Sequence, residues 1–155
     1  MSVKIVNGDL LDAHAAYICH QVNCRGRMAS GVAGQIRAKY PEAFRAYSER
    51  CDGRRSRDDP LEMLGRTQFV RCGDGVTVIN MFSQEGYGRD GGQYTDYEAF
   101  RSCLREIHNA VPADAVIAMP YGIGCGLGGG DWNIIFELIK EELSDHTVEL
   151  WKIEK

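Results

Sequence analysis

Residues 120–132 read PYGIGCGLGGGDW, and six of these thirteen residues are glycine. The stretch follows an apolar run at residues 115–119 (AVIAM), which has the length and composition of a buried strand. Ordered glycine costs backbone entropy, so such a loop needs positive φ angles or an approach too close for a Cβ atom. Its free amides, followed directly by a helix N-terminus, form a concave set of donors that suits phosphate. The alternative interpretation is a flexible connection rich in glycine.

A helical pattern begins directly after this loop. Its apolar residues share one face with the period of an α-helix, and they are Trp132, Ile135, Phe136, Ile139 and Leu143. Asp131 stands at the N-cap position, where a carboxylate ordinarily accepts hydrogen bonds from the free amides of the first turn. At the end of a phosphate-binding loop the same carboxylate can also activate water. Asp131 is therefore a candidate catalytic residue.

Length and composition predict one globular domain spanning residues 1–155, with an ordinary share of hydrophobic (44%) and charged (26%) residues. No apolar stretch is long enough to cross a bilayer and residues 1–9 carry no signal-peptide core, so we expect a cytoplasmic protein without a membrane partner. The six cysteines form no CxxC pair, and we expect neither a metal nor a cofactor. We expect a monomer.

The net charge of −4 argues against a broad nucleic-acid surface, because neutralising phosphates requires an excess of Lys and Arg on one face. Arg54, Arg55 and Arg57 form a local cluster of positive charge, but three aspartates surround it. We therefore interpret this cluster as part of a solvated loop.

The first half of the chain alternates strand and helix patterns. Residues 3–6 read as a short strand followed by the turn residues Asn7-Gly8-Asp9, and residues 15–22 (AAYICHQV) read as a second strand buried on both faces. Buried strands between helices predict a layered α/β domain whose ligands gather at the C-terminal ends of the strands. His20 lies close to such an end. It is either a buried core histidine or a base.

A second glycine-containing loop, residues 23–34 (NCRGRMASGVAG), follows this strand and runs into a helix. One such loop after an early strand and another after a late strand can close on a single ligand from opposite sides. This arrangement suits a diphosphate, and it is the central structural prediction from the sequence.

The remaining segments complete the pattern. Residues 42–51 read as a helix, residues 67–71 and 76–82 as a hairpin joined at Asp74-Gly75, and residues 147–152 as an edge or near-edge strand. The sequence from Thr95 to Glu98 matches a capping box, which predicts a helix with Thr95 as its N-cap. Residues 83–94 (SQEGYGRDGGQY) are either a lid over the ligand or a surface loop without function.

Short motifs alone do not decide the function. Gly124, Gly126 and Gly129 satisfy the GxGxxG dinucleotide fingerprint, but that motif normally opens a Rossmann fold, and here it comes late in the chain. An NAD(P)-binding Rossmann variant therefore stays open as an alternative. The sequence has no GxxxxGK[ST] motif, so a P-loop nucleotidase has no support.

Taken together, the motifs resemble those of the macrodomain family, whose members bind ADP-ribose. The resemblance rests on Gly8-Asp9-Leu10, on Asn23 with the loop that follows it, and on residues 123–127 (IGCGL). It extends over nearly the whole chain through CHQVN, NMFSQ and YTDYEAF. The pattern is most similar to the bacterial and phage type that processes ADP-ribose 1''-phosphate, which is related to the branch containing terminal ADP-ribose glycohydrolase.

The resemblance implies a three-layer α/β/α sandwich around a mixed sheet of about six strands. It also implies that the partner is ADP-ribose, free or attached to protein or nucleic acid. Asp9 would contact the adenine amino group, Leu10 the adenine ring and Asn23 the distal ribose. The diphosphate would lie between two sets of residues, Gly31 and Val32 on one side and Gly124, Cys125, Gly126 and Leu127 on the other.

The chain departs from the family at the positions that carry catalysis. Gln84 stands where the glycohydrolase has a nucleophilic lysine, Gly128 where it has an aspartate, and Ala33 where MacroD-type enzymes have an aspartate. Because glutamine cannot form a Schiff base, a covalent mechanism through lysine is excluded at this position. For a hydrolase, we predict Asp131 as the general base, with His20 or Glu85 assisting.

Two classes of function follow. The first is a hydrolase that removes ADP-ribose from an ester or an N-glycosidic adduct, or that acts on ADP-ribose 1''-phosphate. The second is a reader that binds ADP-ribose or a related NAD metabolite without turnover.

Overall fold

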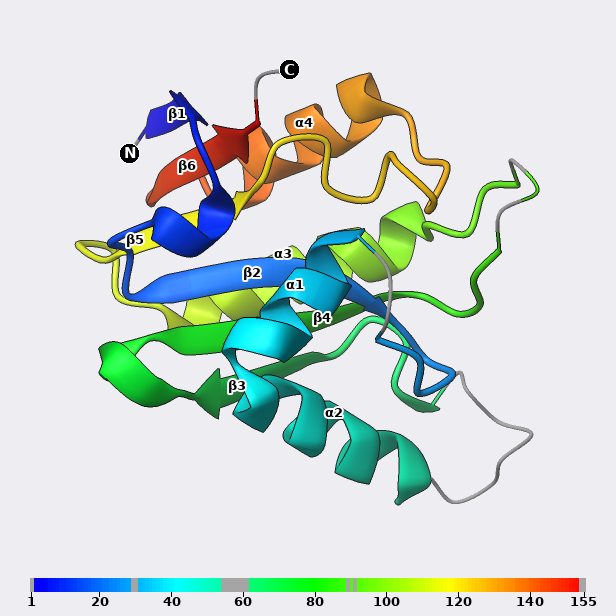
Figure 1. The fold of residues 1–155 in the computed structure, drawn as a ribbon. Helices are drawn as coiled ribbons and strands as arrows, with labels where there is room; N and C mark the ends of the chain where they lie inside the picture. Colours follow the sequence, from blue (N-terminus) through cyan, green and yellow to red (C-terminus); the bar gives the residue numbers. More distant parts are fainter. Residues whose placement is uncertain (1, 29–30, 54–61, 89, 91, 154–155) are drawn as a thin grey trace.

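The computed structural model describes residues 2–28, 31–53, 62–88, 90 and 92–153 (Figure 1). The strands are β1 (Ser2–Asn7), β2 (Tyr17–Asn23), β3 (Thr67–Arg71), β4 (Thr77–Gln84), β5 (Val116–Pro120) and β6 (Thr147–Lys152). The α-helices are α1 (Gly31–Lys39), α2 (Pro41–Asp52), α3 (Tyr97–Ala110) and α4 (Trp132–Glu142). Two 3₁₀ turns, η1 (Leu10–Asp12) and η3 (Gly73–Gly75), follow β1 and β3.

The strands form one six-stranded sheet in the order β1-β6-β5-β2-β4-β3. All neighbouring pairs are parallel except β3 with β4, so the sheet is mixed. Helices α1 and α2 cover one face, and α3 and α4 cover the other (Figure 1). The expected three-layer sandwich is confirmed, and β6 lies second from one edge of the sheet.

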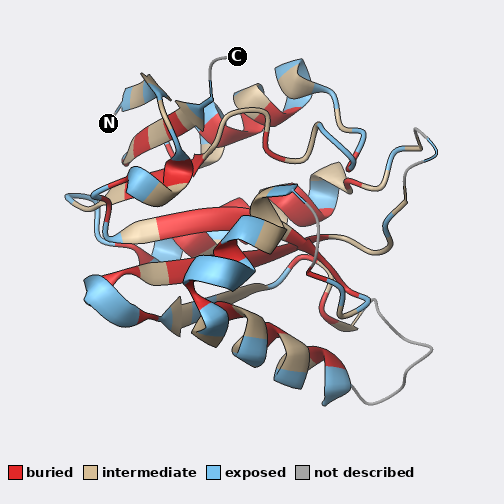
Figure 2. Cartoon of the chain, viewed as in Figure 1, coloured by how far each residue is buried: buried red, intermediate tan, exposed pale blue. Residues whose placement is uncertain are grey.

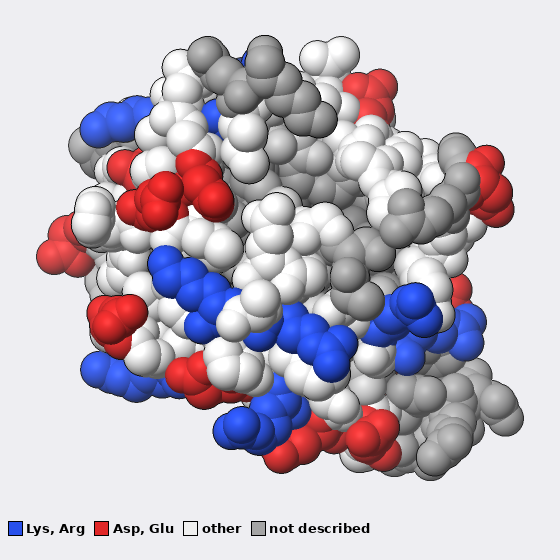
Figure 3. Space-filling model, in the orientation of Figure 1, with Lys and Arg blue, Asp and Glu red and all other residues white. Residues whose placement is uncertain are grey.

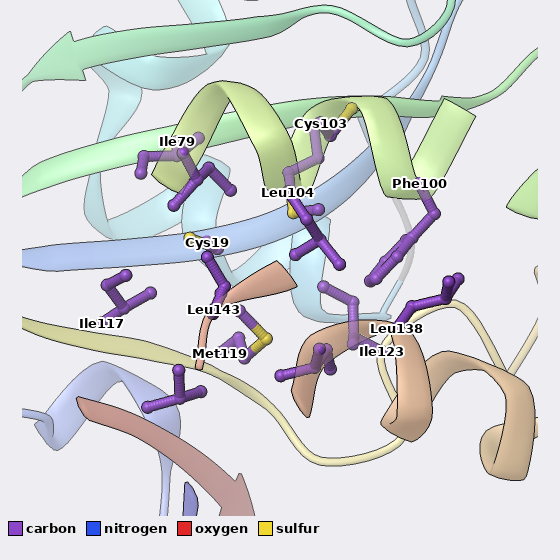
Figure 4. Packing of buried hydrophobic residues seen from close by; sticks show 14 of the residues in the cluster. Cys19, Ile79, Phe100, Cys103, Leu104, Ile117, Met119, Ile123, Leu138 and Leu143 are labelled. Atoms are coloured by element: carbon purple, nitrogen blue, oxygen red, sulfur yellow. The ribbon is translucent and has the colours of Figure 1, made fainter. Parts of the chain in front are cut away.

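The central strands are buried on both faces because helices cover both sides of the sheet. Successive side chains of a strand point to opposite sides, so each strand contributes to both cores. On β2, Cys19 packs in the cluster under α3 and α4, while Ile18 packs in the cluster under α1 and α2. Figure 2 shows this burial along the middle of the sheet. Figure 4 shows Phe100 and Leu104 of α3 directed toward the same core as Cys19. The apolar run of β2 therefore serves two cores at once.

Two residues with restricted backbone preferences occupy positions that suit them. Pro41 occupies the first turn of α2, where its missing N–H costs no hydrogen bond. Asp74 has a φ of 63° in the turn between β3 and β4, a left-handed conformation that aspartate tolerates better than most residues.

The capping box is wrong in one respect, because Thr95 does not cap α3. The N-cap is Asp96, whose side chain accepts a hydrogen bond from the Ala99 amide at 3.0 Å. The Thr95 hydroxyl instead donates to the carbonyl of Gly124 at 2.7 Å. The local sequence pattern assigns this side chain to the helix, but in the fold it bonds to a loop residue 29 positions farther along the chain.

Candidate binding site

A cavity of about 430 Å³ opens at the C-terminal ends of β5, β2 and β4. Its wall is formed by both glycine-containing loops together with the strand ends. The lining residues are His20, Gln21, Gly31, Val32, Ala33, Gln84, Pro120, Tyr121, Gly122, Ile123, Gly124, Gly126, Leu127 and Gly128. The early loop and the late loop, which are far apart in the sequence, therefore meet at one cavity. Residues 29 and 30 of the early loop lie outside the described part of the chain.

Two other cavities lie at the ends of the strands. One of about 410 Å³ is lined by Asn7, Gly8, Asp9 and Ile153, at the C-terminal ends of β1 and β6. Because β6 and β1 are parallel to β5 and come next to it in the sheet, this cavity lies at the same C-terminal ends of the strands as the first. A larger cavity of about 750 Å³ lies at the opposite ends of the strands, where β2 and β4 begin, between η1 and the β3–β4 turn. None of its described lining residues is a predicted site residue.

Hydrogen bonds to side chains behind the late loop hold it in shape. The Thr95 hydroxyl donates to the Gly124 carbonyl, and it accepts a hydrogen bond from Gln21 Nε2 at 2.9 Å. Gln21 Nε2 also donates to Gln84 Oε1 at 2.6 Å, and Gln21 Oε1 accepts from the Ser83 hydroxyl at 2.7 Å. Gln21 is thus the centre of a network that connects β2, β4 and the loop. Neither Gln21 nor Thr95 is a site residue in the sequence analysis.

The same region explains why the loop needs glycine. Gly124 has a φ of 79°, a conformation that side chains disfavour. At Gly128 the constraint is space, because a Cβ atom would lie 2.6 Å from Thr95 Oγ1 and 2.7 Å from the Gly124 carbonyl oxygen. The Gly128 carbonyl accepts hydrogen bonds from the amides of Tyr94 and Thr95 at 2.7 and 2.9 Å. The loop is therefore a fixed cradle and not a flexible connection.

His20 forms part of the cavity wall but is 1% exposed. Its Nε2 lies 2.5 Å from Asn80 Oδ1, and Asn80 Nδ2 donates to the Ala43 carbonyl and to Gln68 Oε1. Because the amide nitrogen of Asn80 donates twice, its oxygen is the acceptor, and His20 carries its proton on Nε2. The Nδ1 atom of His20 has no hydrogen-bond partner among the described residues.

Burial lowers the pKa of His20 to about 4, although the hydrogen bond with Asn80 acts in the opposite direction. The imidazole is therefore neutral at pH 7 and accepts a proton poorly there. Its geometry favours a buried core histidine over a general base.

The two predicted carboxylates do not line the cavity. Asp131 is exposed and caps α4, because its Oδ1 accepts a hydrogen bond from the Asn133 amide at 2.9 Å. Glu85 forms an ion pair with Arg25 at 2.8 Å, and both side chains are about half exposed. Among the described lining residues there is no Asp, Glu, Lys or Arg. An anion in this cavity would meet main-chain amides and the N-terminus of α1.

Asn23 is buried and shapes the early loop from within. Its Nδ2 donates to the Arg27 carbonyl at 2.7 Å, and its Oδ1 accepts from the Arg25 amide and from the Tyr47 hydroxyl at 2.9 and 2.8 Å. Cys125 packs against the core beneath α3 and α4. Burial, with a further contribution from the Asp131 charge, raises the pKa of its thiol to about 11. Asn23 and Cys125 are not among the lining residues.

Of the two predicted adenine contacts, Asp9 lies at the second cavity and Leu10 does not. Asp9 lines it, and its Oδ1 accepts a hydrogen bond from the Leu11 amide at 2.9 Å. Leu10 is 5% exposed and packs in the core beneath α1 and α2. The predicted residues that reach the first cavity are His20, Gly31, Val32, Gly124, Gly126 and Leu127.

The described part of the chain has neither a metal-binding cluster nor a membrane-spanning helix. In that part of the chain, no three His, Cys, Asp or Glu side chains come together as a group able to hold a metal ion. None of its helices has the length and apolar character needed to span a membrane.

The chain is similar to known proteins along most of its length. The family model described as "Macro domain" matches residues 19–139. An uncharacterized 17.5 kDa protein of Enterobacteria phage T4 is 31% identical over 144 residues, which are 87% of this chain and 86% of the phage protein. The DNA ADP-ribosyl glycohydrolase of Mycobacterium tuberculosis is 30% identical over 129 residues. That match includes 82% of this chain but only 34% of the mycobacterial protein, so the chain spans about a third of it.

A solved structure has the same fold. A protein of unknown function from Bacteroides thetaiotaomicron is 28% identical and superposes with a TM-score of 0.84 over 99% of both chains.

The two kinds of glycine in the late loop predict different effects of alanine. Gly128→Ala places a Cβ against backbone and Thr95 and should lower the free energy of unfolding by about 1–3 kcal/mol. Gly126→Ala is the matched control, since its Cβ would meet nothing within 4 Å, and we expect a change within about 0.5 kcal/mol. Urea denaturation of both variants measures the difference. Equal losses would contradict a cradle fixed at Gly128.

The buried His20 predicts a pH effect on stability. The folded pKa of about 4 lies below the ordinary value of 6.5, so the unfolded chain binds the proton more readily between these pH values. The free energy of unfolding should therefore fall as the pH is lowered from 6.5 to 4. Urea titrations at several pH values should show a weaker dependence for His20→Gln than for the wild type. His14→Gln changes an exposed histidine and should leave the dependence intact; a similar flattening there would refute the assignment.

Proposed function

Because the chain belongs to the Macro domain family, we propose that it binds ADP-ribose and releases it from a covalent adduct. The observation that supports this most is the meeting of the two glycine-containing loops at one cavity without charged side chains. A diphosphate can be stabilised there by main-chain amides and by the N-terminal end of α1, which begins at Gly31. This chemistry needs no basic side chain, which agrees with the acidic composition.

The rest of the ligand would extend along the same edge of the sheet. We assign the adenine to the neighbouring cavity, where one carboxylate oxygen of Asp9 accepts no hydrogen bond from the described residues and can accept one from an amino group. The distal ribose would then lie at the far side of the first cavity, beside Gln21 and Gln84. We assign Asn23 an indirect part, because its amide is committed to the early loop that carries Gly31 and Val32.

For the reaction itself we propose Asp131 as the carboxylate that orients or deprotonates water. It ends the late loop, it is exposed, and only one of its oxygens is used as the helix cap. The adduct can join ADP-ribose to protein, to nucleic acid or to a phosphate at C1''.

A reader without turnover is the second candidate. The observation in its favour is that the described lining residues include no carboxylate and no lysine, and that the pKa of His20 is about 4. Such a wall binds an anion well but offers no group that transfers protons at pH 7.

Isothermal calorimetry with ADP-ribose tests binding. We expect saturable binding by the wild type and its loss in Gly126→Val, because this side chain would project into free space beside the diphosphate cradle. Gly73→Val is the matched control, since it also meets nothing within 4 Å but lies in the turn between β3 and β4. The proposal fails if the wild type does not bind millimolar ADP-ribose, or if both variants bind equally.

Two substitutions at Asp131 separate catalysis from helix capping. Asparagine caps helices as well as aspartate but cannot act as a base, whereas alanine does neither. We expect Asp131→Asn to release ADP-ribose from modified protein or nucleic acid about 100-fold more slowly, with its affinity for free ADP-ribose unchanged. Turnover that survives in Asp131→Asn but falls in Asp131→Ala would limit Asp131 to capping. A wild type that binds without turnover would favour the reader.

A further inference from the structure

The positive charge of this acidic chain is segregated. Residues 13–41 contain Arg25, Arg27, Arg37 and Lys39 and no Asp or Glu. The other 14 of the 18 basic residues and all 22 acidic residues lie elsewhere. This segment builds β2, the early loop and α1, and it therefore includes the residues that form one wall of the cavity. We call the four cations the basic segment.

The cations of the basic segment lie on the surface, with Arg25 and Arg27 just after the C-terminal end of β2 and Lys39 at the opposite ends of the strands, where it lines the cavity of about 750 Å³. All four of its side chains are exposed, and Figure 3 shows a row of Lys and Arg side chains across this face of the molecule. Helix α1 begins at the cavity with Gly31. At about 1.5 Å per residue, Arg37 and Lys39 lie roughly 9 and 12 Å along the helix axis from that point. The row thus leads away from the cavity.

Most of these charges are not neutralised by the residues that the structure describes. Arg25 pairs with Glu85, but in the described part of the chain Arg27, Arg37 and Lys39 form no ion pair. The guanidinium of Arg37 lies over the ring of Phe44 at 3.6 Å, and Lys39 Nζ donates to the Leu11 carbonyl. These contacts hold the two side chains in place without cancelling their charge. Ordered cations of one sign are suited to a polyanion.

We propose that the basic segment binds the phosphate backbone of a nucleic acid whose attached ADP-ribose occupies the cavity. This inference rests on the proposed function, because the cavity must hold the ADP-ribose. One strand of a duplex carries a phosphate about every 3.4 Å along its axis, so the roughly 9–12 Å between the start of α1 at the cavity and its two cations corresponds to about three phosphates. An acidic protein is the less favoured partner, since protein interfaces are anchored by aromatic and apolar side chains. In the described part of the chain, none of the large exposed hydrophobic residues lies in this segment.

Charge removal on α1 tests the proposal against a matched control. The variant Arg37→Gln/Lys39→Gln removes two charges from the row, and Lys4→Gln/Arg71→Gln removes two exposed charges outside it. Binding to free ADP-ribose, to an unmodified oligonucleotide and to the same oligonucleotide carrying ADP-ribose is measured at several salt concentrations. Gln35→Lys adds a charge at an exposed position of α1 and gives the opposite change.

We expect the wild type to bind the ADP-ribosylated oligonucleotide more tightly than free ADP-ribose. The α1 double variant should lose about tenfold in this affinity at low salt, with a shallower salt dependence and unchanged binding of free ADP-ribose. Gln35→Lys should gain affinity, and the control variant should match the wild type. The inference is overturned if the attached oligonucleotide does not tighten binding, or if the control variant loses as much affinity as the α1 double variant. It is also overturned if the α1 double variant weakens the binding of an ADP-ribosylated acidic peptide by the same factor. Failure to bind free ADP-ribose would instead refute the proposed function.

Discussion

The hydrogen bond from the Thr95 hydroxyl to the Gly124 carbonyl is the contact on which the site depends. It joins the start of α3 to the late glycine loop, and Gln21 fixes it from behind by donating to the same hydroxyl. The space left between Thr95 and the loop is too small for any side chain at position 128. The loop is consequently ordered before a ligand arrives, so binding would not have to pay for ordering it.

The order of the strands determines what this ordered loop faces. Because β5 lies beside β2 in the sheet, the loop after β5 meets the loop after β2, although about a hundred residues separate them. The next strands along the same edge, β6 and β1, bring the second cavity and Asp9 into line with the first. Under the proposed function, an elongated ligand with a base at one end and a diphosphate in the middle would lie along these strand ends. The parallel arrangement is what places all these strand ends together.

The ionised side chains of this region lie outside the described cavity wall. The described cavity wall carries no ionised side chain, and its buried imidazole is neutral because burial opposes the charged form. The carboxylate Asp131 and the ion pair of Arg25 with Glu85 lie outside that wall. The cations of α1 lie farther along the surface. The net charge of −4 hides this division, since a sum over the chain does not show that one segment holds four cations and no acid.

The sequence alone determined the layered α/β class, the two glycine-containing loops and the N-cap role open to Asp131, because these follow from local periodicity and from the backbone needs of glycine. It could not show that Thr95 leaves its helix to bind Gly124, that Gln21 organises the loop, or that Asn23 turns inward to the early loop. A polar residue within the buried β2 pattern was the one available signal for Gln21. The tertiary structure decided these roles, because each is a hydrogen bond whose partner is fixed by packing of the folded chain and not by spacing along it.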